Sequence, residues 1–90
     1  MLVHNIENHE YQVTLEGEYV ALAKYSLQGS VMTIHSTRVP DEVQGKGYGK
    51  VLMEAILPDI EQRGYTVIPA CSYVAHYLNR HPEWQHLLAG

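Results

Sequence analysis

The chain has 90 residues, of which 46% are hydrophobic, and it carries a formal net charge of −4. This length suits a single domain with one core over residues 1–90, and an acidic chain without a Lys/Arg cluster is not expected to bind nucleic acid. Cys71, the lone cysteine, cannot form an internal disulfide. No apolar run has the character of a signal peptide or a membrane span, so we expect a cytoplasmic protein without membrane contact.

Alternation of apolar and polar residues predicts four strands in the first half of the chain. Residues 2–8 alternate weakly, as an edge strand does, whereas residues 11–15 alternate clearly. Residues 19–27 form a longer apolar run that is typical of a more central strand, and glycine-containing turns flank it. With a fourth strand at residues 31–39, the pattern indicates an antiparallel meander.

The fourth predicted strand should have two distinct faces, because side chains alternate along a strand. One face is expected to carry Val31, Thr33, His35, Thr37 and Val39. The other face is expected to carry Met32, Ile34, Ser36 and Arg38. This alternation would place His35 and Thr37 on the same side of the sheet.

The second half of the chain begins with a helical pattern at residues 47–63. Its apolar stripe is expected to consist of Val51, Leu52, Ala55, Ile56 and Ile60. Pro58 lies inside this run and should kink or split the helix, because proline lacks an amide hydrogen and crowds the preceding turn. Residues 65–69 then form a short apolar strand, which a right-handed crossover would place parallel to the fourth strand.

Two short helices are expected at the C-terminal end, at residues 72–80 and 82–88, the second with Pro82 in its first turn. Tyr73 and Tyr77 share one face of the first of these helices and can either line a groove or fill the core. The predicted fold is therefore α/β (α+β). It has a mixed, mostly antiparallel five-stranded sheet, a long helix after strand four and two short C-terminal helices.

The stretch Gln44-Gly45-Lys46-Gly47-Tyr48-Gly49-Lys50 joins the fourth strand to the long helix. Glycines at alternate positions let the backbone turn with its amide hydrogens pointing one way, and the first amides of the helix have no partner within it. Such a loop is suited to a phosphate or pyrophosphate. A Walker loop is excluded, because Gln44 and Val51 stand where that motif requires Gly and Ser/Thr. The dinucleotide-binding fingerprint is excluded as well, because Lys50 stands in the place of its third glycine.

Two side chains near the carboxyl ends of the predicted parallel strands are candidates for chemistry, since ligands of open α/β sheets bind beyond those ends. Cys71 precedes a helix start, where the helix dipole favours a thiolate that could accept an acyl group, although a buried, inert cysteine is the alternative. His35 could accept a proton, or it could be a structural histidine. The histidines at 76, 81 and 86 are five residues apart and do not stack on one helical face, so no metal site is expected.

The segment 44–49 matches the Gln/Arg-x-x-Gly-x-Gly/Ala motif of the GNAT acyl-CoA N-acyltransferases, and Val39-Pro40 before it is similar to the same superfamily. The segments Ile68-Pro69-Ala70-Cys71-Ser72-Tyr73-Val74 and Asn79-Arg80-His81-Pro82-Glu83-Trp84 resemble the small, single-domain members of about a hundred residues. The resemblance covers about residues 10 to 88. Gln44 departs from the arginine that many relatives carry, and the N-terminal substrate-binding helices of larger members are missing.

This resemblance implies a minimal GNAT fold that binds acetyl-CoA or coenzyme A and transfers the acetyl group to an amine on a small molecule or a protein. The implied coenzyme-binding residues are Thr37, Arg38, Val39, Gln44, Gly45, Lys46, Gly47, Tyr48, Gly49 and Lys50. Cys71 and His35 are the implied catalytic residues, with direct transfer or transient acylation of Cys71 left open. A coenzyme A-binding module without turnover, acting as a sensor or partner subunit, is the alternative.

Overall fold

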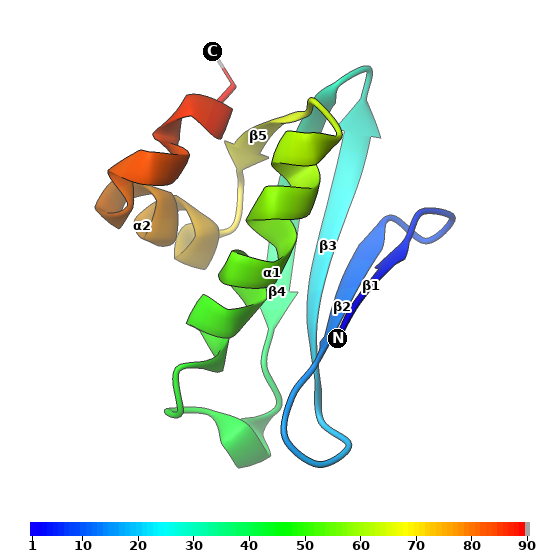
Figure 1. Cartoon of the computed structure of the whole chain (residues 1–90), viewed down its shortest axis with the longest axis vertical. Coiled ribbons are helices and arrows are strands. Elements are labelled where there is room, and N and C mark those ends of the chain that lie inside the picture. The colour runs from blue at the N-terminus through cyan, green and yellow to red at the C-terminus, as the bar shows by residue number, and fades with distance from the viewer. Residues whose placement is uncertain (90) are drawn as a thin grey trace.

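The computed structural model describes residues 1–89 as a five-stranded sheet with helices packed against it (Figure 1). The strands are β1 (Leu2–Asn5), β2 (Glu10–Thr14), β3 (Val20–Gln28), β4 (Val31–Arg38) and β5 (Thr66–Pro69), in that order across the sheet. The helices are α1 (Tyr48–Gln62) and α2 (Ser72–Arg80), with 3-10 turns η1 (Asp41–Val43) and η2 (Pro82–Leu87). Neighbours from β1 to β4 are antiparallel, and β4 and β5 are parallel, which confirms the predicted mixed sheet.

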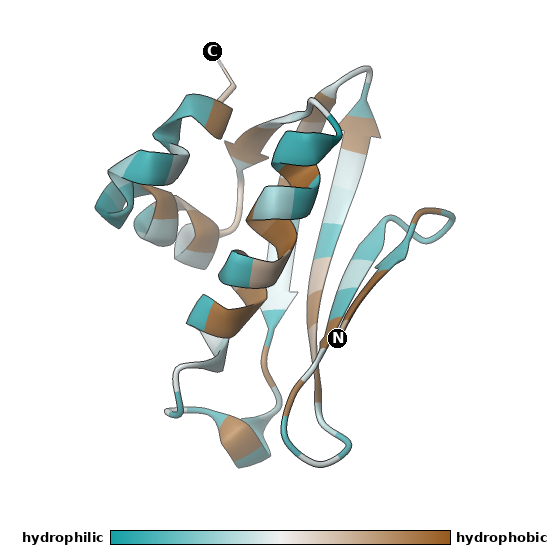
Figure 2. Cartoon of the chain, viewed as in Figure 1, coloured by the Kyte–Doolittle hydropathy of each residue, from teal (hydrophilic) through white to brown (hydrophobic). Residues whose placement is uncertain are grey.

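Helix α1 lies along one face of the sheet (Figure 2), and its buried apolar residues share one core with those of the strands. Its fully buried residues are Leu52, Met53, Ile56, Leu57 and Ile60. The predicted stripe was wrong at one edge, because Val51 is 40% exposed while Met53 and Leu57 are buried. Turning the longer side chains inward, in place of Val51 and Ala55, removes more apolar surface from water. None of the helices within residues 1–89 has the length and apolar character needed to cross a membrane.

Pro58 does not split α1, which runs without interruption from Tyr48 to Gln62. The proline lies on the exposed side of the helix, and so does Glu54, four residues earlier. The Glu54 carbonyl, which would receive the hydrogen bond that proline cannot donate, therefore faces water as an alternative partner. Exposure of this side of the helix explains why the expected split is absent.

A one-residue irregularity in β4 changes the direction of its side chains. Lys24 of β3 pairs with Ser36 and Tyr25 pairs with Ile34, so His35 has no partner across the ladder. Such a bulge shifts the alternation by one residue. Thr37 consequently pairs with buried Ala23 and lies on the α1 side of the sheet with Ile34. The predicted face that joined Thr37 to His35 was therefore wrong.

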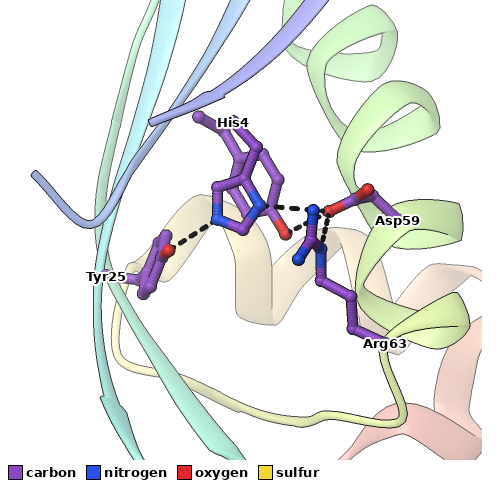
Figure 3. Close-up of polar contacts among 5 residues, drawn as sticks. His4, Tyr25, Asp59 and Arg63 are labelled. Carbon is purple, nitrogen blue, oxygen red and sulfur yellow. Dashed lines mark hydrogen bonds and ion pairs between the residues drawn. The ribbon is translucent and has the colours of Figure 1, made fainter. Parts of the chain in front are cut away.

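A polar cluster joins the first three strands to the C-terminal half of α1 (Figure 3). The Asp59 carboxylate accepts hydrogen bonds from the Tyr11 hydroxyl at 2.7 Å and from Arg63 Nε at 2.8 Å. His4 stacks on the Tyr11 ring and shares a hydrogen bond with the Tyr25 hydroxyl, and its Nδ1 lies 3.4 Å from Asp59 Oδ2. The cluster fixes the short edge strand β1 to the rest of the molecule.

Candidate functional site

The glycine-rich loop adopts backbone conformations that its glycines make accessible. Gly45 and Gly47 have φ of 82° and 81°, and Gly47 is the N-cap of α1. Residues with a β-carbon rarely adopt such left-handed angles. The Gln44 side chain holds the loop by donating to the Val39 carbonyl at 3.0 Å and to Asp41 Oδ1 at 3.1 Å. The free amides at the start of α1 are thereby presented at the end of β4.

A pocket of about 440 Å³ lies where this loop, α1 and β4 meet. Its lining includes eight of the ten residues predicted to bind the coenzyme, all except Arg38 and Lys46. These eight are Thr37, Val39, Gln44, Gly45, Gly47, Tyr48, Gly49 and Lys50. Val43, Leu52 and Tyr73 complete the lining. Thr37 and Val39 reach the pocket because the bulge in β4 turns their side of the strand toward α1.

Tyr73 of α2 closes one side of the pocket by lying over Gly49. A β-carbon at residue 49 would sit 2.7 Å from the Tyr73 hydroxyl oxygen, closer than real β-carbons approach other atoms. Partial burial raises the pKa of Tyr73, which keeps its hydroxyl protonated at neutral pH. The sequence allowed Tyr73 and Tyr77 either to line a groove or to fill the core. In the structure, Tyr73 lines the pocket and Tyr77 is buried in the core.

Beside the pocket, β4 and β5 part. Their ladder ends at the pair Ile34–Pro69, and the Cys71 amide makes a last hydrogen bond to the Ile34 carbonyl at 3.0 Å. Beyond this point, Ser36, Thr37 and Arg38 pair only with β3 among the described strands. The edge of β4 that faces away from β3 is therefore open, and its backbone groups can pair with an extended ligand.

Cys71 lies at the start of α2, with its Sγ atom 3.5 Å from the Thr37 hydroxyl oxygen. Burial alone would raise the pKa of the thiol, but hydrogen bonds from the Thr37 side chain and from the amides of Val74 and Tyr73 lower it overall. A lowered pKa increases the share of thiolate, the nucleophilic form. Cys71 does not line the pocket itself but contacts Thr37, which does.

The structure does not bring His35 into the pocket. Its Nε2 atom bonds the Ser26 hydroxyl at 2.8 Å, and Ser26 lies on the exposed face of the sheet opposite α1. The bulge is the cause, since it leaves His35 outside the normal alternation of β4. The backbones of Cys71 and His35 lie near each other, because the Cys71 amide bonds the carbonyl of Ile34, the residue before His35. The His35 side chain, however, lies with Ser26 on the exposed face of the sheet, whereas the Cys71 side chain contacts Thr37.

Two predicted coenzyme ligands, Arg38 and Lys46, lie outside the pocket lining. Arg38 pairs with Leu22 of β3, and its side chain is exposed on the face away from α1. Lys46 belongs to the loop, but its Nζ atom lies 2.6 Å from Glu16 Oε1 in the β2–β3 connection. Neither arrangement could be predicted from local sequence, because one depends on the bulge and the other on a residue 30 positions away.

Comparison with known proteins identifies the family. The family model of the GCN5-related N-acetyltransferases matches residues 9–87. The solution structure of a GCN5-like protein from Staphylococcus aureus superimposes with a TM-score of 0.75 at 23% identity, covering 100% of this chain and 88% of the other.

The ribosomal-protein-S18-alanine N-acetyltransferase from Escherichia coli gives a TM-score of 0.63, also at 23% identity, over 86% of this chain and 53% of its own length. Both likenesses support the fold. Enzymes of this family in general transfer the acetyl group of acetyl-CoA, which agrees with the resemblance seen in the glycine loop and in the segment around Cys71. The chain belongs to the GCN5-related N-acetyltransferase family.

Proposed function

We propose that residues 1–90 form one domain that transfers an acetyl group from acetyl-CoA to an amine acceptor. The observation that carries the proposal is the pocket at the start of α1, where a glycine loop with free amides meets the open edge of β4. The amine can belong to a small molecule or to a protein. The family membership supports the reaction class, and the lining residues support the place of the donor.

The phosphates of the coenzyme would lie against the amides of residues 45–49. Amides at a helix N-terminus carry a partial positive charge, and Gly47 lets the backbone approach a ligand closely. Lys50, which also lines the pocket, adds a full positive charge. Gln44 stabilises the loop through its two hydrogen bonds and does not have to contact phosphate directly.

The pantetheine arm would pair with the open edge of β4 near Thr37 and Val39, both of which line the pocket. When bound, acetyl-CoA would supply a thioester whose acyl carbon accepts a nucleophile while its C–S bond breaks and coenzyme A leaves as the thiol. The Cys71 thiolate, stabilised by the Thr37 hydroxyl and by amides of α2, is one candidate nucleophile. The acceptor amine is the other, and direct attack by it leaves Cys71 with only its contact to Thr37 beside the pocket.

His35 would act on an acceptor that approaches from the exposed face of the sheet. Its imidazole lies there beside Ser26, next to the place where β4 and β5 part. A histidine at such an opening can accept the proton that an amine loses on acylation. This role does not require contact between His35 and Cys71.

The separation of the His35 and Cys71 side chains favours a second candidate, a coenzyme A-binding module without turnover. Such a module would bind acetyl-CoA in the same pocket and report its level to a partner. Binding and turnover must therefore be measured separately.

Titration calorimetry with coenzyme A tests the binding site. Gly47 has φ of 81°, an angle that Asn and Asp tolerate better than most residues, so Gly47→Asp and Gly47→Asn form a matched pair that differs in charge. We expect micromolar binding by the wild type, about −8 kcal/mol. We expect retention of most affinity in Gly47→Asn and loss of at least tenfold in Gly47→Asp, because only the aspartate repels the phosphates. Equal coenzyme A affinities of the two variants would show that the pyrophosphate does not bind at this loop.

Turnover is tested by release of free coenzyme A from acetyl-CoA in the presence of a panel of amines. We expect His35→Gln to lower kcat by about 100-fold while leaving the coenzyme A affinity unchanged, as for loss of a general base. Cys71→Ala separates the two routes: an acyl-enzyme requires the thiol, whereas direct transfer tolerates its loss. Coenzyme A binding without turnover of any amine would support the binding module instead.

A further inference from the structure

Lys46 is the residue of the glycine loop that turns away from the pocket. Gly45 and Gly47 on either side of it line the pocket, as do Tyr48, Gly49 and Lys50, but Lys46 does not. Its ammonium is 2.6 Å from the Glu16 carboxylate. Glu16 lies in the connection between β2 and β3, which reaches the same end of the molecule as the glycine loop (Figure 1).

We propose that Glu16 competes with the phosphates of the coenzyme for Lys46 and thereby sets the affinity of the site. Lys46 would then have two positions, on Glu16 in the empty protein and on a phosphate in the complex. This inference rests on the proposed function, since it assumes that a phosphate-bearing ligand occupies the pocket. Glu16 lies outside the pocket lining and belongs to the connection between β2 and β3.

The ion pair is suited to exchange. The side chains of Lys46 and Glu16 are 55% and 45% exposed, and exposed ion pairs contribute little net stability, so they break at low cost. Their hydrogen bond raises the pKa of Lys46 and lowers that of Glu16, so both groups are charged at neutral pH. Glycines on both sides of Lys46 give the backbone freedom to redirect the lysine.

Glu16 opposes anion binding in two ways. It neutralises one of the two lysines of the loop, and its own negative charge remains near the site after Lys46 has left it. Because Glu16 contacts Lys46, and the neighbouring Gly45 and Gly47 line the pocket, this carboxylate lies beside the site. Removal of the Glu16 charge should therefore strengthen coenzyme binding.

The opposite role for Glu16 is to hold the loop in its binding conformation. In that case Glu16 would preorganise the glycine loop, and its removal would weaken coenzyme binding. The two roles predict opposite signs for one substitution, so a single titration separates them.

The test is calorimetry with coenzyme A on the wild type, Glu16→Gln and the control Glu18→Gln. Glu18 lies two residues away in the same connection and carries the same charge. Among the described residues, the ion pair of Lys46 is with Glu16, not with Glu18. We expect Glu16→Gln to bind coenzyme A about fivefold more tightly at low salt, with a smaller gain for Glu18→Gln. The gain in affinity of Glu16→Gln should shrink as the salt concentration is raised. It should be absent for pantetheine, which has no phosphate and whose binding is measured by chemical-shift titration.

Lys46→Met in both backgrounds completes a double-mutant cycle. We expect the loss of affinity on removing Lys46 to be larger in the Glu16→Gln background, where the lysine is free for the phosphate, than in the wild type. A loss of the same size in both backgrounds would overturn the competition, and so would unchanged or weaker binding by Glu16→Gln. If neither the wild type nor any variant binds coenzyme A, the proposed function is contradicted, and so is the competition between Glu16 and the phosphates.

Discussion

Gly49 has no side chain at the point where the ring of Tyr73 crosses the start of α1. A β-carbon there would lie 2.7 Å from the Tyr73 hydroxyl oxygen and 2.8 Å from Cζ of the same ring. Gly49 does not have a left-handed φ, so backbone strain does not explain the glycine. The close approach of Tyr73 does, and it links α2 to the glycine loop.

At this scale we predict that Gly49→Ala does not stabilise the wild-type protein and lowers its free energy of unfolding by at most about 1 kcal/mol. Alanine favours a helix over glycine by about 1 kcal/mol, but the new methyl group must displace Tyr73. In a Tyr73→Ala background the obstacle is gone, and the same substitution should stabilise by about 1 kcal/mol. Urea unfolding of the four proteins measures both values. The same effect in both backgrounds would show that Tyr73 does not constrain residue 49.

At the scale of single elements, α1 carries a proline that its neighbours tolerate. Pro58 lies on the exposed side of the helix, where the carbonyl it leaves without a hydrogen bond can be hydrated. We predict that Pro58→Ala stabilises the protein by about 1–2 kcal/mol, because alanine restores a helical hydrogen bond, while the more flexible unfolded chain offsets part of the gain. The midpoint of urea unfolding measures this change. Destabilisation would mean that packing of α1 depends on a bend at the proline.

At the scale of the whole molecule, the cluster around His4 connects three strands to α1 (Figure 3). Burial and the charge of Arg63 lower the pKa of His4, although Asp59 opposes them. The folded protein therefore binds a proton at His4 less readily than the unfolded chain, whose histidine has a pKa near 6.5. Stability contributed by neutral His4 is complete above this value and is lost as the pH falls toward the pKa of the folded state.

We predict that the free energy of unfolding declines between pH 7.5 and 5.5 by more in the wild type than in His4→Gln, which cannot titrate. The difference is limited to about 1.4 kcal/mol per pH unit for one proton. Urea unfolding at the two pH values measures it, and each protein serves as its own reference, so any loss of stability from the substitution itself cancels. Equal declines would show that His4 takes up its proton as readily in the folded state as in the unfolded chain.

The arrangement of the elements could be predicted because it depends on local patterns. Alternation predicted β2 and β4, a longer apolar run predicted β3, the helical period predicted α1, and a right-handed crossover predicted that β5 is parallel to β4. The glycine loop could also be predicted, since its required φ angles favour glycine over other residues. Together with the segment around Cys71, these patterns were enough to indicate the family.

The directions of individual side chains could not be predicted in the same way. The bulge at His35 has no mark in the alternation of residues 31–39, and it moves Thr37 to the α1 side while leaving His35 on the exposed side. Lys46 turns away from the pocket because Glu16, 30 residues earlier, pairs with it. Tyr73 reaches the pocket because Gly49 leaves room for its ring.

The sequence by itself therefore determined the order of the elements, the glycine-rich loop before α1 and the family, because periodicity and glycine content act within a few residues of the chain. Tertiary structure decided which side chains meet at the pocket. The bulge depends on how β4 pairs with β3, and the Glu16–Lys46 pair joins residues 30 positions apart; no periodicity in either segment encodes these contacts.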